Sequence, residues 1–314
     1  MTHPLLAEIP FPAINPVAIH VGWLQIRWYG IAYLVGFLVA GMVFDKLVRD
    51  AFLPLTKEKV SDFIGWLVVS VILGGRLGYA LFYEPALLTH PAELVKIWQG
   101  GLSFHGGLIG VAVGSWLFAR REHVPWLRLG DAMALAIPFG IFLVRCANFI
   151  NGELFGRIAP AWLPWAMRFP TDPAGRTLSP ELARAGGLDW HQAYVQLKAS
   201  GRWSQIAAHI PLRHPSQLYE ALLEGVVTGV ILWVIYLRRG KPARVTGGLA
   251  GAFLLLYAAA RFLVEFAREP DPQLGTVLGP FTMGQILSVG VALGGLWLAL
   301  RRPSAVDAAE NPGL

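Results

Sequence analysis

Long apolar stretches alternate with shorter polar segments along the whole chain. The apolar stretches predict helices near 26–44, 60–83, 101–119, 130–151, 217–237, 247–266 and 282–300. Each holds about 18–24 residues with almost no charge, which is enough for a helix to cross a hydrocarbon core of roughly 30 Å. The pattern therefore predicts an all-α multi-pass membrane protein with seven transmembrane helices, and we expect one membrane domain over residues 1–314.

Composition favours the same class of protein. The 314 residues are 55% hydrophobic and 15% charged, whereas soluble proteins carry about 25% charged residues. The single cysteine, Cys146, excludes a disulfide within the chain.

Basic residues gather in the connections after the first, third and fifth predicted helices and in the C-terminal tail. They are Lys46, Arg49, Lys57, Lys59, Arg120, Arg121, Arg128, Arg238, Arg239, Lys241, Arg244, Arg301 and Arg302. Because short basic connections stay in the cytoplasm, we expect a periplasmic N-terminus and a cytoplasmic C-terminus. The net charge of +6 is then a signal of topology, and we expect no nucleic-acid partner.

Two connections on the opposite side have features of their own. The connection 152–216 is long and mixes tryptophans, prolines and charges, which predicts a small periplasmic head between the fourth and fifth helices. Segment 84–99 predicts an amphipathic helix on the outer membrane surface.

Several charged residues lie inside the apolar stretches, where each costs about 2.5–3.5 kcal/mol at a helix centre. Arg145 comes about 15 residues from the inner end of its helix, or roughly 22 Å at 1.5 Å per residue. Arg76 and Arg261 fall at a similar height, and Tyr29 and His105 lie near the outer ends of their helices. The unusual polar residues thus converge on the outer leaflet.

Some of these residues have structural explanations that the sequence leaves open. Arg27 is expected to be an interfacial anchor, and Arg76 either bonds backbone carbonyls or serves a site. His105 is either a buried core histidine or a site residue. The glycines around it either permit close helix packing or let a lipid chain approach; they are Gly100, Gly101, Gly106, Gly107 and Gly110.

Arg145 and Arg261 are harder to explain structurally. Arg261, Glu265 and Arg268 follow i, i+4, i+7 spacing and share a helix face. Arg145 and Asn148 also share a face, and the polar run continues with Asn151, Gly152 and Glu153. Two guanidiniums at one cavity repel unless an anion separates them, and guanidinium suits phosphate. We therefore expect a phospholipid headgroup site at the outer boundary of the membrane.

The stretch "HPSQLYEALLEG", 214–225, brings further polar residues to the same level. They are Gln217, Tyr219, Glu220 and Glu224. The His-Pro-Ser triplet is typical of a helix start, so helix capping accounts for part of this stretch.

Six stretches in order resemble the prolipoprotein diacylglyceryl transferase family of bacterial inner membranes. They are "RWYGIAYLVGF" (27–37), "GGRLGYALFY" (74–83), "GGLSFHGGLIG" (100–110), "RCANFINGELFG" (145–156), "HPSQLYEALLEG" (214–225) and "YAAARFLVEFAREPD" (257–271). The resemblance covers essentially the whole chain. One departure is Val144, which stands where the family pattern usually has glycine before the signature arginine.

The resemblance implies a specific reaction. Family members transfer the diacylglyceryl group of phosphatidylglycerol to the thiol of the lipobox cysteine in a prolipoprotein signal peptide, and glycerol phosphate leaves. It implies that Arg145 and Arg261 are the essential pair. The expected substrate-binding residues are Arg145, Tyr29, Asn148, Asn151, Glu153, Gly156, Tyr257, Glu265 and Arg268.

The expected mechanism needs a thiolate and a stabilised leaving group. Positioned arginines stabilise charge that develops on the phosphate, and the substrate thiol, with an unperturbed pKa near 8.5, needs activation. By residue type His105 is the expected catalytic base, although an arginine-rich field is an alternative activator. Cys146 is expected to be a bystander, and we expect no metal and no cofactor.

Two other classes of function stay open from the residues alone. Intramembrane arginines also mark the ion pathways of secondary transporters and anion channels, although transporter sites tend to lie at the membrane midplane between repeats. A lipid-binding scaffold that uses the 152–216 head is the other alternative.

Overall fold

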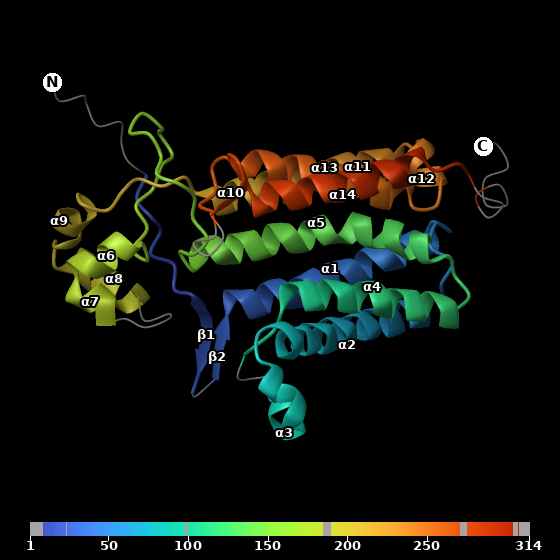
Figure 1. Ribbon diagram of the computed structural model, residues 1–314, viewed down its shortest axis with the longest axis horizontal. Coiled ribbons are helices and arrows are strands. Elements are labelled where there is room, and N and C mark those ends of the chain that lie inside the picture. Colours follow the sequence, from blue (N-terminus) through green and yellow to red (C-terminus); the bar gives the residue numbers. More distant parts are fainter. Residues whose placement is uncertain are drawn as a thin grey trace. The chain divides into compact units, whose positions relative to one another are not determined.

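A computed structural model of the 314-residue chain describes residues 9–22, 24–97, 100–184, 190–270, 275–303 and 307. Helices occupy all seven expected ranges (Figure 1). Their bounds are α1 Trp28–Arg49, α2 Lys57–Phe82, α4 Phe104–Arg121, α5 Trp126–Ile150, the continuous run Ser216–Leu237, α13 Gly248–Val264 and α14 Met283–Leu300.

Five of these helices are long and apolar enough to cross a membrane. They are α1, α2, α5, Ser216–Leu237 and α14. Helix α13 is apolar but shorter. A mainly helical protein with several helices long and apolar enough to span a membrane is therefore confirmed, while seven crossings and their direction stay predictions.

The chain divides into two compact units. The first unit comprises Met1–Gly36, Ile137–Leu237 and Gly251–Arg301. The second unit comprises Phe37–Ala136, Arg238–Ala250 and Arg302–Leu314. Three of the five division points fall inside α1, α5 and α13, so each of these helices contributes to both units.

In the second unit, glycines bring α2 and α4 into close contact. A Cβ atom at Gly74 would lie 2.4 Å from the carbonyl oxygen of Gly106, and one at Gly78 would lie 2.6 Å from the Gly106 Cα. A Cβ at Gly110 would lie 2.2 Å from the carbonyl oxygen of Ser70. The expectation that glycines in this region permit close helix packing is confirmed for Gly106 and Gly110.

Arg76 of α2 is a buried structural cation. Its guanidinium donates to the carbonyl oxygens of Glu93 (2.7 Å), Leu94 (2.8 Å), Gly100 (2.8 Å) and Gly101 (3.1 Å). The side chain thus ties the connection after α2 to the helix itself. Of the two explanations that the sequence left open, the structural one holds.

The prediction of one amphipathic helix over 84–99 is wrong, because its described residues form two short helices. The structure has a 3₁₀ helix, η1 Pro85–Thr89, and a single helical turn, α3 Pro91–Leu94. His90 separates them with φ −125° and ψ 75°. Proline cannot donate to the preceding turn and disfavours helical backbone at the residue before it, so Pro91 ends the first helix.

Other elements of the second unit cluster around Asp131. Helix α12 Lys241–Arg244 precedes α13, and the buried Asp131 carboxylate accepts hydrogen bonds from the backbone N–H groups of Gly247 (2.8 Å) and Ala250 (2.9 Å). Because the first N–H groups of a helix lack partners within it, Asp131 stabilises the start of α13.

In the first unit, residues 152–216 build a folded head from short helices. They are α6 Pro173–Leu178, α7 Pro180–Arg184, α8 Trp190–Ala199 and α9 Trp203–Ala207. Its core consists of Phe11, Met167, Phe169, Trp190 and Tyr194. The Tyr194 hydroxyl donates to the carbonyl oxygen of Phe11 (2.8 Å), so the N-terminal segment is part of the head.

Among the described residues of the first unit, four short strands qualify the all-α expectation. Strands β1 Val17–Val21 and β2 Leu24–Arg27 form an antiparallel hairpin, and β3 Thr276–Leu278 pairs with β4 Phe281–Thr282. The first helix was expected from residue 26, but it begins at Trp28 because residues 26 and 27 pair with β1.

The run Ser216–Leu237 changes its helical form along its length. It consists of α10 Ser216–Glu220, a π-helical segment η3 Ala221–Val227 and α11 Thr228–Leu237. It packs on α5 through two glycines four residues apart. A Cβ at Gly225 would lie 2.8 Å from Phe142 Cβ, and one at Gly229 would lie 3.2 Å from Pro138 Cβ. This close packing brings α10 and η3 alongside the end of α5.

Candidate functional site

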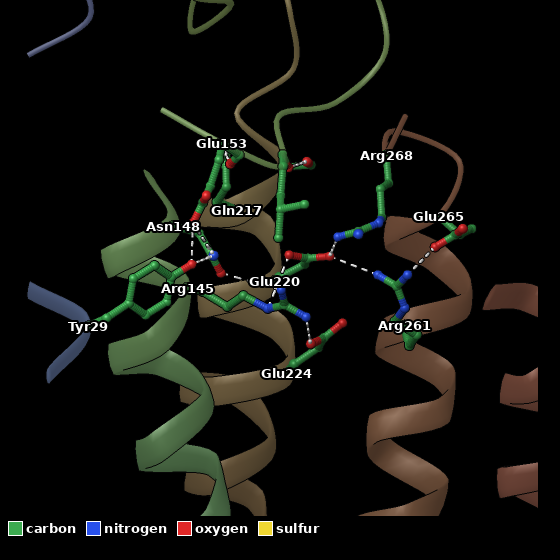
Figure 2. A network of polar contacts seen from close by, with 12 residues as sticks. Tyr29, Arg145, Asn148, Glu153, Gln217, Glu220, Glu224, Arg261, Glu265 and Arg268 are labelled. Carbon is green, nitrogen blue, oxygen red and sulfur yellow. Dashed lines mark hydrogen bonds and ion pairs between the residues drawn. The ribbon is translucent and has the colours of Figure 1, made fainter. Parts of the chain in front are cut away.

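The expected site residues of the first unit meet where three helices end. Arg145 lies near the C-terminal end of α5, Arg261 near the C-terminal end of α13, and Glu220 at the C-terminal end of the short α10. Figure 2 shows their side chains pointing toward one another across the space between the helices.

Glu220 is the centre of the arginine cluster, and it is fully buried. Its Oε1 accepts hydrogen bonds from Nη1 of Arg261 (2.7 Å) and Nη1 of Arg268 (2.8 Å). Its Oε2 forms an ion pair with Nε of Arg145 at 3.1 Å. One carboxylate therefore bridges three guanidiniums. From the sequence, the anion between Arg145 and Arg261 is expected to be a lipid phosphate. In the structure, Glu220 occupies this place.

Glu265 fixes Arg261 from the opposite side. Its Oε2 lies 2.7 Å from Arg261 Nη2, and its Oε1 accepts a hydrogen bond from the Thr282 hydroxyl (2.8 Å). A Cβ at Gly284 would lie 2.7 Å from Oε1, so this glycine leaves room for the carboxylate. The i, i+4 pair that the sequence predicted is confirmed. Arg268 lies beyond the end of α13 but still reaches the same cluster.

Glu224 is the third acidic residue of the cluster. It is fully buried, and its Oε2 lies 3.7 Å from Arg145 Nη2. Arg145, Arg261 and Arg268 contribute three positive charges, and Glu220, Glu224 and Glu265 contribute three negative charges. The formal charges of these six side chains therefore balance.

A second group of polar side chains adjoins Arg145. The Tyr29 hydroxyl donates to Glu153 Oε1. The side-chain amide of Asn148 donates to the Tyr29 hydroxyl and to Glu153 Oε1, and that of Asn151 donates to Glu153 Oε1 (3.4 Å). Arg145 Nη1 donates to Asn148 Oδ1 at 3.5 Å, so the two groups form one network (Figure 2).

Gly156 and Tyr257 border the network. A Cβ at Gly156 would lie 2.2 Å from the carbonyl oxygen of Ala267, and its N–H donates to the carbonyl oxygen of His214 (2.8 Å). Close backbone approach therefore requires glycine here. Tyr257 is half-buried on α13 and interacts electrostatically with Arg145 and Arg261.

His105 lies in the second unit, outside this network. It occupies the first turn of α4, where its side chain is exposed and meets the Phe104 ring edge to face. A buried core histidine, one of the two alternatives from the sequence, is therefore wrong. The role of His105 as a base stays a prediction.

Three residues of the network are absent from the site predicted from the sequence. Glu220 and Glu224 hold arginines, and the fully buried Gln217 donates to the carbonyl oxygen of Glu153 (2.6 Å). The signal was present, because two carboxylates inside an apolar span are costly. Helix capping had accounted for this stretch too readily.

The donor set does not suggest a metal. Among the described residues, no group of three or more His, Cys, Asp or Glu side chains is placed to hold a metal ion. The carboxylates of the network instead face guanidiniums, which fork around carboxylates and phosphates alike.

Comparison with known proteins decides the family. The family profile described as prolipoprotein diacylglyceryl transferase matches residues 16–301. The chain belongs to this family. The resemblance drawn from the six sequence stretches is therefore confirmed.

Curated relatives cover the chain almost completely. A phosphatidylglycerol–prolipoprotein diacylglyceryl transferase of Rhodospirillum centenum is 44% identical over 95% of both chains. Proteins with the same name from Rhizobium meliloti and Gluconobacter oxydans are 40% and 42% identical, over 97% and 98% of this chain and 98% and 99% of their own. The similarity therefore includes the head and both compact units.

Proposed function

We propose that this protein transfers the diacylglyceryl group of phosphatidylglycerol to prolipoproteins. The observation that carries the proposal is the convergence of three arginines on one buried carboxylate in a chain of this family. Arginine forks match the oxygen geometry of phosphate. The names of the relatives favour a transferase over a transporter or a channel.

The finer chemistry follows from the substrates. The acceptor is the thiol of the lipobox cysteine in the signal peptide. Its sulfur attacks the glyceryl carbon that is bonded to the phosphate oxygen, a thioether forms, and the oxygen leaves with the bonding electrons as glycerol phosphate. Arg145 and Arg261 stabilise the charge that develops on this phosphate, in surroundings where burial strengthens each interaction.

The remaining polar residues position the substrates. Tyr29, Asn148 and Glu153 hold the Arg145 side of the site through their mutual hydrogen bonds. Glu265 and Arg268 hold the Arg261 side. Asn151, Gly156 and Tyr257 border the same space.

The site faces the periplasmic leaflet of a bacterial inner membrane. Two features support this placement. The network lies at the C-terminal ends of α5 and α13 and at the N-terminal end of the run Ser216–Leu237. The basic connections lie at the opposite ends of these helices, and basic connections stay in the cytoplasm.

A mass spectrum tests the activity. Detergent-purified protein is incubated with phosphatidylglycerol and a synthetic lipobox peptide that has one cysteine, and phosphatidylethanolamine replaces phosphatidylglycerol in a parallel reaction. We expect the mass of one diacylglyceryl group on the cysteine with phosphatidylglycerol alone. A folded protein that gives no mass gain, beside an active relative, would show the proposal to be wrong.

A further inference from the structure

Glu224 differs from the other two carboxylates of the arginine cluster. Glu220 accepts two hydrogen bonds from arginines, and Glu265 accepts one from Thr282. No hydrogen bond from the described residues reaches either oxygen of Glu224. Its ion pair with Arg145, at 3.7 Å, is the longest in the cluster. Glu224 is therefore a buried carboxylate whose lone pairs stay available to another donor.

Glu224 also lies at an unusual position for a carboxylate. A buried acceptor without hydrogen bonds destabilises the fold, and more so when it is charged. Glu224 lies in the π-helical segment η3, and such segments occur frequently at functional sites. Packing alone would favour an apolar residue at this position, so a chemical role accounts better for the carboxylate.

Arg145 is the cation that an incoming anion can draw away. Its contacts with Glu220, Asn148 and Glu224 measure 3.1, 3.5 and 3.7 Å. Arg261, in contrast, has carboxylate oxygens at 2.7 Å on both sides. A phosphate diester that binds Arg145 competes first with its weakest partner, Glu224. Once Arg145 has turned to the phosphate, Glu224 faces the substrates without its cation.

We propose that Glu224 accepts the proton of the acceptor thiol during transfer. This inference rests on the proposed function and assigns its proton acceptor. The S–H proton moves to a Glu224 oxygen, the sulfur forms its bond to the glyceryl carbon, and the C–O bond breaks with its electron pair on the phosphate oxygen. The protonated Glu224 then returns its proton to solvent when the glycerol phosphate departs.

Charge balance supports this assignment. The six charged side chains of the cluster sum to zero, and the phosphate diester adds one negative charge, which becomes two when the C–O bond breaks. If Glu224 takes the proton, the cluster loses one negative charge as the leaving group gains one. Separated charge is costly in a buried site, so proton transfer to Glu224 keeps the total charge of cluster and phosphate unchanged through the reaction.

A selenocysteine peptide separates proton acceptance from a structural role. A selenol is already ionised near neutral pH, so it needs no base. The variant Glu224→Gln keeps the shape of the side chain but accepts no proton. With the cysteine peptide we expect this variant to lose about 10²–10⁴-fold in kcat, the usual contribution of a positioned base. With the selenocysteine peptide we expect the loss to shrink by about tenfold or more.

Two variants serve as controls. Glu220→Gln removes the bridge between the guanidiniums, so we expect equal losses with both peptides. His105→Gln tests the other expected base, and we expect its kcat to fall by the same factor with both peptides. Thermal unfolding of each purified variant shows whether it folds. If Glu224→Gln does not fold, Glu224→Asp replaces it. We expect Glu224→Asp to lose less kcat than Glu224→Gln, and to lose more with the cysteine peptide than with the selenocysteine peptide.

The outcomes distinguish this inference from the function on which it rests. If the wild-type protein modifies neither peptide, the proposed function is wrong. Suppose that the wild-type protein is active. If kcat of the folded Glu224 variant then falls by the same factor with both peptides, or does not fall, Glu224 is not the proton acceptor. If only His105→Gln is more active with the selenocysteine peptide than with the cysteine peptide, His105 is the proton acceptor instead.

Discussion

At the scale of single residues, Arg145 and Arg261 are held very differently. Arg261 lies between Glu220 and Glu265 with both carboxylate contacts at 2.7 Å, whereas no contact of Arg145 with a side chain of the network is shorter than 3.1 Å. The difference favours Arg261 as the fixed side of the site. We therefore expect Arg145 to be the arginine that reorients toward an incoming phosphate.

Glu220→Gln tests the centre of the cluster. The change leaves three guanidiniums around a neutral group, and breaking a buried ion pair costs about 3–5 kcal/mol. We expect the midpoint of thermal unfolding in detergent to fall and transfer to the lipobox peptide to be lost. Glu269→Gln is the matched control, because its side chain is 48% exposed in its ion pair with Arg213, and exposed pairs contribute about 0–1 kcal/mol. Equal unfolding midpoints for the two variants would contradict this description of Glu220.

His214 gives the head a pH-dependent stability. Burial lowers the pKa of this imidazole below its ordinary value of 6.5, so the unfolded chain binds more protons than the folded one below that pH. Stability is full above pH 6.5 and falls as the pH drops toward the pKa of the folded state. We expect the unfolding midpoint to decline as the pH falls below about 6.5, and to decline less in His214→Gln. Identical profiles would show that His214 does not contribute.

Glu181 does not confound this measurement. Hydrogen bonds from Ser179, from its own backbone and from Arg202 lower its pKa from 4.5 to about 2. Stability from this carboxylate is therefore present above pH 4.5 and is lost as the pH falls toward 2. The loss from Glu181 therefore begins at a lower pH than the loss from His214.

Residue spacing predicted four of the six charged side chains of the cluster. Helical periodicity placed Arg145 with Asn148 and Arg261 with Glu265, and both pairs form. Periodicity within one helix cannot show which residues of another helix face it, so the bridging role of Glu220 was missed. The tight backbone contact at Gly156 was likewise invisible, because Ala267 and His214, which form it, are distant in sequence.

At the scale of elements, the contact between α5 and the run Ser216–Leu237 sets the site. Gly225 and Gly229 allow the approach of the helices, and η3 follows Glu220 directly. The position of Glu220 beside Arg145 therefore depends on how closely the two helices pack.

Gly225→Ala tests this dependence. The added methyl group would lie 2.8 Å from Phe142 Cβ and 3.0 Å from its Cα, so the helices must separate, and overpacking of this kind costs about 1–3 kcal/mol. We expect a lower unfolding midpoint and reduced transfer. At Gly290 of α14 an added Cβ meets nothing within 4 Å, so Gly290→Ala should be neutral or stabilising by about 0.5–1 kcal/mol. A Gly225→Ala protein with the stability and activity of the Gly290→Ala control would contradict the account.

The apolar stretches predicted which parts of the chain are helical better than they predicted where each helix begins and ends. Helix α5 begins at Trp126 rather than 130, and α13 ends at Val264 rather than 266. The strands were missed because they hold only two to five residues, too few for an alternating pattern to stand out from an apolar background. The π-helical form of η3 had no signal in the sequence.

At the scale of the whole molecule, the direction of the helices can be tested by thiol labelling. In a Cys146→Ser background, Ser200→Cys places one thiol in the head and Arg302→Cys places one in the tail, and both positions are exposed. With a membrane-impermeant maleimide added to intact spheroplasts, we expect labelling at 200 only. After lysis both positions should react. Labelling at 302 in intact spheroplasts would reverse the predicted topology.

Composition and charge distribution predicted the class of the molecule. The seven apolar ranges all correspond to helices, and several helices are long enough to span a membrane. The division into two compact units was not predicted, because three of its boundaries lie inside the apolar helices α1, α5 and α13. The aromatic core of the head was also hidden, since Phe11 joins it from the distant N-terminal segment.

The central claim is that the arginine cluster of the first unit performs the transfer. The most direct test is the mass of the lipobox peptide after incubation with phosphatidylglycerol and one of three proteins: wild type, Arg145→Ala and Arg202→Ala. Arg202 is the control arginine, because its side chain is 54% exposed in the head. We expect the diacylglyceryl mass with wild type and Arg202→Ala, and at least a 10²-fold lower rate, on the scale of a lost oxyanion donor, with folded Arg145→Ala. Arg145→Ala with a rate near that of wild type would contradict the account.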